Sequence, residues 1–215
     1  MSHSELATIP VSANSMKEEA LSRIAEHGAD PLFVNRWSSR AFAARPVAEQ
    51  TLLAILEAAR WAPSSNNFQP WRFIVAREES QLKLFHEFIV PGNLEWAAQA
   101  PVLILLLSSV QEDGKMNGAH AFDTGAAWAS IALQASLLGL NTRAIGGYDR
   151  VKARELLSIP ANFELHAVVA LGYPGSTELL PDKFKDRNVP SGRRPLQESI
   201  IWGDFSTESN GQVTK

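Results

Sequence analysis

Residues 62–71 read Ala-Pro-Ser-Ser-Asn-Asn-Phe-Gln-Pro-Trp, a polar loop between two prolines that leads directly into an apolar run. The loop supplies hydroxyl and amide groups without charge, which suits the imide and carbonyl edge of an aromatic heterocycle. The alternative is turn chemistry between a helix and a strand, where proline, serine and asparagine are common. The loop residues that we select as ligand contacts are Pro63, Ser64, Ser65, Asn67 and Gln69.

A second segment, residues 36–42, reads Arg-Trp-Ser-Ser-Arg-Ala-Phe. Arg36 and Arg40 offer planar forks of donors that match a phosphate group, and Ser38 adds a hydroxyl between them. Taken alone, the spacing also fits a solvated helix face with surface ion pairs. Two further arginines at positions 193–194 lie in a polar segment, where the alternative is an ordinary surface loop.

Two glycines, Gly146 and Gly147, end the apolar stretch 142–145. Glycine at a strand end allows a ligand ring to approach the backbone and a main-chain N–H to face it. The alternative is a strand-to-helix turn that needs positive φ, with Asp149 as the helix cap. No G-x-G-x-x-G follows a strand and no G-x-x-x-x-G-K-[ST] occurs, which argues against a Rossmann dinucleotide site and a P-loop.

Composition limits the classes of protein that fit this chain. Its 215 residues are 45% hydrophobic and 20% charged, with a net charge of −3 and no cysteine. These values fit a globular protein, argue against nucleic-acid binding, and exclude disulfides, thiolate metal sites and a cysteine nucleophile. We see no basic n-region with an apolar h-region at the N-terminus and no apolar run long enough for a bilayer. We therefore expect a cytoplasmic protein without nucleic-acid or membrane partners.

Hydrophobic periodicity and turn residues predict one α+β domain with long helices around a modest sheet. Residue boundaries are expected at 1–30 for an N-terminal helical segment, 31–205 for the domain and 206–215 for a polar tail. The stretch 122–138 is apolar nearly all round and predicts a buried central helix. Further helices are expected at 16–27, 52–59, 78–88, 95–99 and 150–157, strands at 71–76, 102–107, 142–145 and 165–171, a turn at 91–92, and loops at 188–195 and 206–215.

Four motifs in order resemble the FMN-dependent nitroreductase family. They are Arg-x-Ser-x-Arg-x-Phe, Ala-Pro-Ser-Ser-x-Asn-x-Gln-Pro-Trp, Ile-Gly-Gly-Tyr-Asp and Arg-Arg-Pro-Leu, spread over roughly positions 30 to 200. The resemblance implies an α+β, nitroreductase-like fold, with a central, mostly antiparallel sheet surrounded by helices, in an intertwined homodimer with FMN at the interface. The nearly all-apolar helix and six tryptophans in 215 residues also favour a dimer, because one small core does not readily cover them.

The resemblance assigns roles to individual residues. Arg36 and Ser38 correspond to contacts with FMN phosphate and ribityl, and Arg40 to a cation near the pyrimidine side. The loop at 62–71 corresponds to the isoalloxazine contacts, some from the neighbouring protomer, and the glycine pair to the segment near flavin N5. The predicted cofactor-binding residues are Arg36, Trp37, Ser38, Arg40, Pro63, Ser64, Ser65, Asn67, Gln69, Ile145, Gly146, Gly147, Arg193 and Arg194.

The implied activity is electron transfer from NADH or NADPH through FMN to nitroaromatics, quinones or other electron-poor acceptors. The alternatives are another flavin task on the same fold, such as dehalogenation or flavin fragmentation, and non-enzymatic FMN binding. No catalytic side chain and no metal site are expected. Several well-known family members carry Glu-Gly where this chain has Gly146-Gly147, so nicotinamide positioning is not carried over. We expect His120 to be an exposed residue at a helix start, with a place in the pocket as the alternative.

Overall fold

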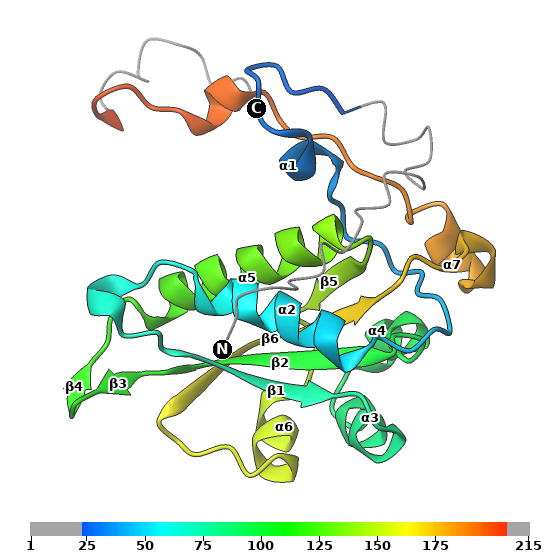
Figure 1. Cartoon of the computed structure of the whole chain (residues 1–215), viewed down its shortest axis with the longest axis horizontal. Helices are drawn as coiled ribbons and strands as arrows, with labels where there is room; N and C mark the ends of the chain where they lie inside the picture. The colour runs from blue at the N-terminus through cyan, green and yellow to red at the C-terminus, as the bar shows by residue number, and fades with distance from the viewer. Residues whose placement is uncertain (1–22, 206–215) are drawn as a thin grey trace, which may run out of the picture.

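A four-stranded antiparallel sheet forms the centre of the protein, in a computed structural model that describes residues 23–205 (Figure 1). Neighbouring strands lie in the order β1-β2-β6-β5 and every neighbouring pair is antiparallel. All eight residues of β2 are buried, because its apolar sequence has helices on both sides. The strand bounds are Trp71–Ala76 for β1, Val102–Ser109 for β2, Asn141–Ile145 for β5 and Phe163–Gly172 for β6.

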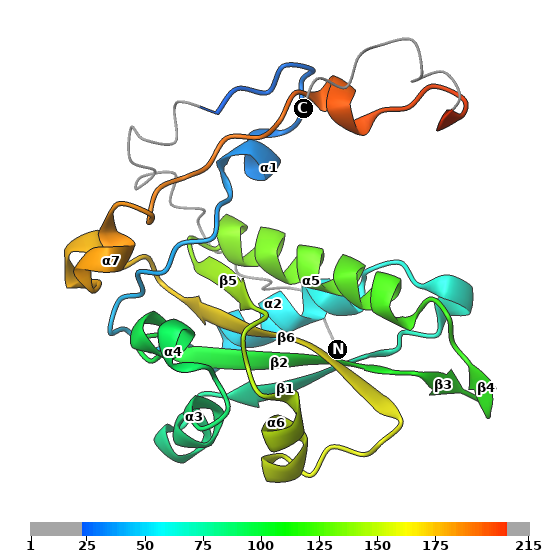
Figure 2. The ribbon, with the colours of Figure 1, turned by 180° about the vertical axis from the view of Figure 1, so that it is seen from behind.

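Helices cover both faces of this sheet (Figures 1 and 2). On one face, Ile104 of β2 packs in a core with α2 (Glu49–Arg60) and α5 (His120–Leu137). On the other face, Leu105 belongs to a second core, which the remaining central helices complete. The alternation of β2 side chains between two cores is the period of two that a strand imposes. These remaining helices are α3 (Glu79–His86), α4 (Pro91–Ala97) and α6 (Arg150–Leu156).

The long helix α5 is buried on one side only. Ala127, Ile131 and Ala135 pack against the sheet and α2, whereas Phe122 is 84% exposed. The helix stops at Leu137, and Gly139 follows with a φ of +73°, as a C-terminal glycine cap requires. The predicted central helix is therefore confirmed in place, but the prediction that it is buried all round is wrong for a single chain, because its outward face has no covering layer.

Two other predictions need correction. The structure has no helix in residues 23–27, so the helix expected at 16–27 does not extend there, and residues 16–22 lie outside the described part. Pro91 and Gly92 open α4 instead of forming a turn, because proline's fixed φ and missing N–H suit the first helical position. The four predicted strands and the helices at 52–59, 78–88 and 150–157 are confirmed within a few residues.

Two segments lie outside the layers, at the top of Figure 1. One runs from residue 23 through α1 (Pro31–Asn35), and the other follows α7 (Asp182–Lys185) to residue 205. They expose large apolar side chains, among them Phe33, Trp202 and Phe205. The remaining short elements are η2 (Ser65–Asn67), β3 (Gln111–Glu112), β4 (Lys115–Met116), η3 (Thr177–Leu179) and η4 (Leu196–Ser199). Within residues 23–205, no helix combines the length and apolar character needed to cross a bilayer.

Candidate functional site

The arginine segment 36–42 is fixed at its C-terminal end. Phe42 is fully buried and forms an isolated β-bridge with Pro174. The amide of Gly175 donates to the carbonyl of Ala41 at 3.1 Å. A Cβ on Gly175 would lie 2.5 Å from the backbone of Phe42, so only glycine permits this approach. The buried anchor positions the preceding residues, which carry the polar groups.

Asn188, which follows α7, holds the same segment in place by hydrogen bonds. Sequence reasoning did not identify this residue. Its side chain is buried, and its Oδ1 accepts from the Arg40 amide at 2.7 Å and from the Ser39 hydroxyl at 3.3 Å. Its Nδ2 donates to the Thr177 hydroxyl at 3.0 Å. The contacts with Arg40 and Ser39 span 148 and 149 positions of sequence. No local pattern predicts them.

Arg143 is a second residue that the sequence did not reveal. It comes from β5, donates to the carbonyl of Ser38, and holds its guanidinium 5.4 Å from the Trp96 ring centroid. Burial and, secondarily, the nearby Arg40 lower the pKa of Arg143 to about 10. Within residues 23–205, no carboxylate forms an ion pair with Arg143 or Arg40. Within the described part of the chain, no ion pair therefore compensates the positive charge of these two side chains.

Arg36 lies at the end of α1 and joins this charged region. Its Nη1 is 3.5 Å from the Ser38 hydroxyl, and burial, followed by repulsion from Arg193, lowers its pKa. The structure thus places Arg193 close enough to repel Arg36, and the shared anion site of the two arginines stays a prediction. Arg194 is exposed and forms no hydrogen bond or ion pair with other described residues, so its predicted role stays a prediction. Trp37 lies half-buried in the same segment.

The glycine pair follows β5 directly. Ile145 is buried and pairs with Val168. The backbone at Gly146 is open, because a Cβ added there would have no neighbouring atom within 4 Å. A Cβ added at Gly147 would lie 2.6 Å from Asn93 Nδ2. Neither glycine has positive φ, so close approach rather than turn geometry accounts for Gly147. Asp149 does cap α6, because its side chain accepts from the Lys152 amide at 3.0 Å.

The polar loop 63–70 adopts unusual backbone geometry. Asn66, Asn67 and Gln69 have φ values of 50°, 57° and 49°, in the left-handed region that few side chains other than asparagine adopt easily. The loop is held by Ser64, whose hydroxyl accepts from the Gln69 amide at 3.1 Å. It is also held by buried Asp123 of α5, which accepts from the Ser65 amide at 3.1 Å. These two bonds hold the backbone that carries the exposed polar side chains.

The loop and the arginine segment lie near opposite ends of α5 within one chain. The loop contacts Asp123 in the first turn, whereas Arg143 follows the helix end by six residues and contacts Ser38. Eighteen helical residues at about 1.5 Å each span about 27 Å. Figures 1 and 2 agree on this arrangement. The two halves of the predicted site therefore do not meet in a single chain.

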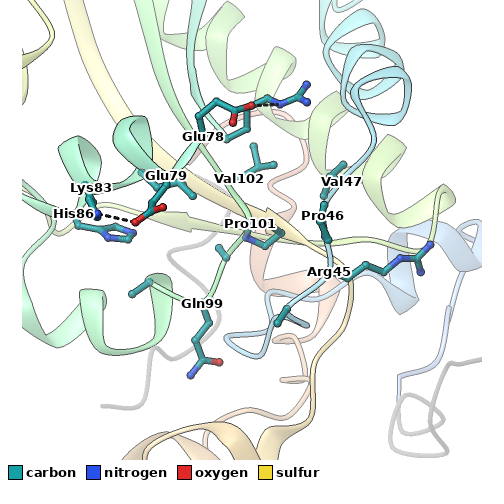
Figure 3. A pocket seen from close by; sticks show the side chains of 15 residues that line it. Arg45, Pro46, Val47, Glu78, Glu79, Lys83, His86, Gln99, Pro101 and Val102 are labelled. Carbon is teal, nitrogen blue, oxygen red and sulfur yellow. Dashed lines mark ion pairs between the residues drawn. The ribbon is translucent and has the colours of Figure 1, made fainter.

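A cavity of about 660 Å³ lies elsewhere, between the loop at 44–47 and α3 (Figure 3). Four of its charged side chains are already paired, since Arg77 lies 3.4 Å from Glu78 and Lys83 lies 2.7 Å from Glu79. The Arg45 guanidinium lies 3.7 Å from the centroid of the Tyr173 ring. It contains none of the predicted cofactor-binding residues. Its lining residues are Ala44, Arg45, Pro46, Val47, Arg77, Glu78, Glu79, Leu82, Lys83, His86, Ala98, Gln99, Ala100, Pro101 and Val102.

His120 begins α5 as expected, but the expectation that it is exposed is wrong. Its side chain is 14% exposed, and its Nδ1 lies 2.7 Å from the buried hydroxyl of Ser108. The same hydroxyl lies 2.6 Å from Nε2 of His166, so it can donate to one ring and accept from the other. Burial lowers the pKa of His166, and nearby Glu164 opposes that shift. Among the described residues, no group of three His, Cys, Asp or Glu side chains could hold a metal ion.

Comparisons with known proteins agree with this geometry. The Nitroreductase family model matches residues 34–90 and 83–173. A putative NADH dehydrogenase/NAD(P)H nitroreductase of Archaeoglobus fulgidus is 36% identical over 150 residues, which cover 66% of this chain and 83% of that protein. An FMN reductase [NAD(P)H] of Bacillus subtilis is 33% identical over 183 residues, covering 76% and 68% of the two chains.

Solved structures show the same likeness. A crystal structure described as an oxidoreductase containing FMN has 42% sequence identity and a TM-score of 0.81. The match covers 85% of this chain and 96% of that one. The family model covers more than half of the present sequence, including the arginine segment, the polar loop and the glycine pair. The resemblance predicted from the four motifs is confirmed: this chain belongs to the nitroreductase family.

Proposed function

We propose that this protein is an FMN-dependent oxidoreductase that takes electrons from NADH or NADPH and passes them to nitroaromatics, quinones or other electron-poor acceptors. The observation that carries the proposal is the set of arginines that form no ion pair within residues 23–205, one of which, Arg143, lies on the strand that ends at the open backbone of Gly146. The relatives named for NAD(P)H, and the reductase and crystal structure named for FMN, support the cofactor and the electron donor.

The donor set of the arginine segment fits a phosphate group. Arg36 and Arg193 supply guanidiniums, and Ser38 supplies a hydroxyl within reach of Arg36. A phosphate dianion would compensate the burial of the Arg36 guanidinium and its repulsion by Arg193, which together lower the pKa of Arg36. Arg194 is one residue from Arg193 and could add a further donor.

The planar part of the cofactor fits the open end of β5. FMN, when bound, supplies a ring that accepts hydride and passes on electrons. Gly146 leaves room for a ring against the backbone. Arg40, held by Asn188, and Arg143 place positive charge near the same edge, where it stabilises negative charge. The chain thus contributes binding, orientation and electrostatics, without a catalytic acid or base.

A second copy of the chain would complete the site. The polar loop lies near the opposite end of α5 from the arginines, so a two-fold pairing along α5 could bring one copy's loop to the other copy's arginines. The exposed Phe122 on α5 and the exposed Phe33, Trp202 and Phe205 of the outer segments supply apolar surface for such a pairing.

An anaerobic absorbance titration tests the function. Purified protein should show an oxidised flavin spectrum that bleaches on addition of NADH or NADPH and recovers when nitrofurazone or a quinone is added. Bound flavin that neither donor bleaches would contradict the reductase proposal and leave a flavin-binding protein. A colourless protein that takes up no FMN would contradict the cofactor assignment itself.

A further inference from the structure

Arg23 lies outside all four motifs, on the segment before α1, yet its guanidinium reaches the first motif. Its Nη1 donates to the carbonyl of Arg36 at 3.0 Å. That bond uses one of five guanidinium N–H donors, and the other four form no hydrogen bond with residues 23–205. The side chain is half-buried, and the carbonyl holds its planar fork in a defined position beside Arg36.

Three guanidiniums from three separate segments thus come together: Arg23 before α1, Arg36 after it, and Arg193 in the C-terminal segment. Burial lowers the pKa of Arg23, and repulsion from Arg193 and Arg36 lowers it further. Repulsion from Arg193 also adds to the effect of burial on the pKa of Arg36. Each cation therefore raises the energy of its neighbours in the absence of an anion.

No described carboxylate compensates this charge. Across residues 23–205, none forms an ion pair with the three arginines, although Asp30 lies nearby in sequence and instead caps α1 through the Leu32 amide at 2.8 Å. Some other cations are paired, since Arg77 and Lys183 lie 3.1 Å and 2.6 Å from carboxylate oxygens. Arg45 and Arg72 also form no ion pair within residues 23–205. The three-arginine group differs from these because its members repel one another and the Arg23 guanidinium is hydrogen-bonded to the backbone of Arg36.

We infer that Arg23 is a third guanidinium of the cofactor phosphate site and makes the protein select FMN over unphosphorylated riboflavin. The inference rests on the proposed function, since it concerns the phosphate of the same cofactor. A phosphate monoester carries nearly two negative charges at neutral pH and offers three acceptor oxygens. Two guanidiniums match that charge, but their two forks donate fewer hydrogen bonds than three phosphate oxygens accept, and Arg23 supplies further donors and additional positive charge.

A purely structural role would leave a different signature. If Arg23 only tethered its segment through the Arg36 carbonyl, its loss would disturb the site whether or not the ligand carried a phosphate. Arg23→Gln separates the two roles, because glutamine retains amide N–H donors for the carbonyl but has no charge. Riboflavin serves as the probe that lacks the phosphate and keeps the ring.

The experiment measures dissociation constants of FMN and riboflavin for the full chain freed of flavin, as wild type, Arg23→Ala, Arg23→Gln and Arg77→Ala. We expect both Arg23 variants to bind FMN about tenfold more weakly and riboflavin within about twofold of wild type. The FMN affinity of both should also depend less steeply on salt. Arg77→Ala removes an arginine whose charge is already paired, and should change neither constant.

Three results would overturn the inference. Equal losses for FMN and riboflavin would make Arg23 structural, and unchanged FMN affinity in both variants would remove it from the site. Loss of FMN affinity in Arg23→Ala alone would assign the effect to the carbonyl tether. A wild-type chain that binds neither flavin would instead refute the proposed function, so the two failures are distinguishable.

Discussion

Asn188→Ala should destabilise the fold and weaken cofactor binding together, because Asn188 is the buried link between the C-terminal segment and the arginine segment. Its side chain is 5% exposed and forms hydrogen bonds with Arg40, Ser39 and Thr177. Truncation loses three bonds worth about 0.5–1.5 kcal/mol each and leaves the partly buried Arg40 amide unpaired. Ser39 keeps a 3.5 Å contact with the Ala41 carbonyl, which offsets part of the loss.

From these contributions we expect the free energy of unfolding to fall by about 2–3 kcal/mol. Urea denaturation of the flavin-free chain measures that loss, and FMN titration measures the second effect, because Arg40 is then no longer held in place. Asn162→Ala is the matched control: Asn162 is exposed, and its replacement should change stability by less than about 0.5 kcal/mol.

Asn188→Asp separates packing from charge. Aspartate keeps the acceptor for Arg40 and Ser39 but adds a negative charge beside Arg40, so stability should fall less than in the alanine variant. The affinity for FMN should nevertheless fall, because that charge partly neutralises the positive region. If Asn188→Ala unfolds at the wild-type urea concentration and binds FMN normally, the reasoning about this link is wrong.

Three further predictions follow from the same geometry. Burial holds the pKa of His166 below the unfolded value of about 6.5, so the free energy of unfolding should decline as pH falls below that value. In His166→Gln, the urea midpoint should therefore decline less between pH 7.5 and pH 5.5 than in the wild type. Gly175→Ala should lower the free energy of unfolding, measured by urea denaturation, by at least about 2 kcal/mol, because the new Cβ would lie 2.5 Å from the backbone of Phe42. Gly118→Ala is the control, since a Cβ at Gly118 would have no atom within 4 Å, and it should change the free energy of unfolding little. Phe122→Asp should shift the light-scattering mass from a dimer toward the 23.5 kDa chain, and a dimer that persists would place the interface elsewhere.

The sequence predicted well those helices and strands whose own residue pattern reflects their surroundings in the fold. The run from Val102 is apolar at successive positions because both faces of β2 are covered, and Gly139 ends α5 because only a residue tolerant of positive φ fits there. Pro91 misled us because proline is compatible with both a turn and the first position of a helix, and the choice is made by the packing of Trp96 in the core.

The site was only partly accessible to sequence reasoning. The arginines, the polar loop and the glycine pair stand in short motifs, so their residue types could be read directly. Asn188, Arg143 and Asp123 could not be found that way, since each acts on a residue 58 or more positions distant. His120 was misjudged for the same reason: its burial depends on Ser108 and His166, which the sheet brings to the start of α5.

The separation of the two half-sites along α5 has a genetic consequence. In a two-fold dimer of the proposed kind, each cofactor would meet the loop of one copy and the arginines of the other. A chain damaged only in the loop at 63–70 and a chain damaged only at Arg36 would each form dimers with no complete site. A mixed dimer of the two would have one site in which both halves are intact and one in which both are broken. Two inactive alleles of this gene could therefore restore activity when expressed together, up to half of the wild-type level per mixed dimer.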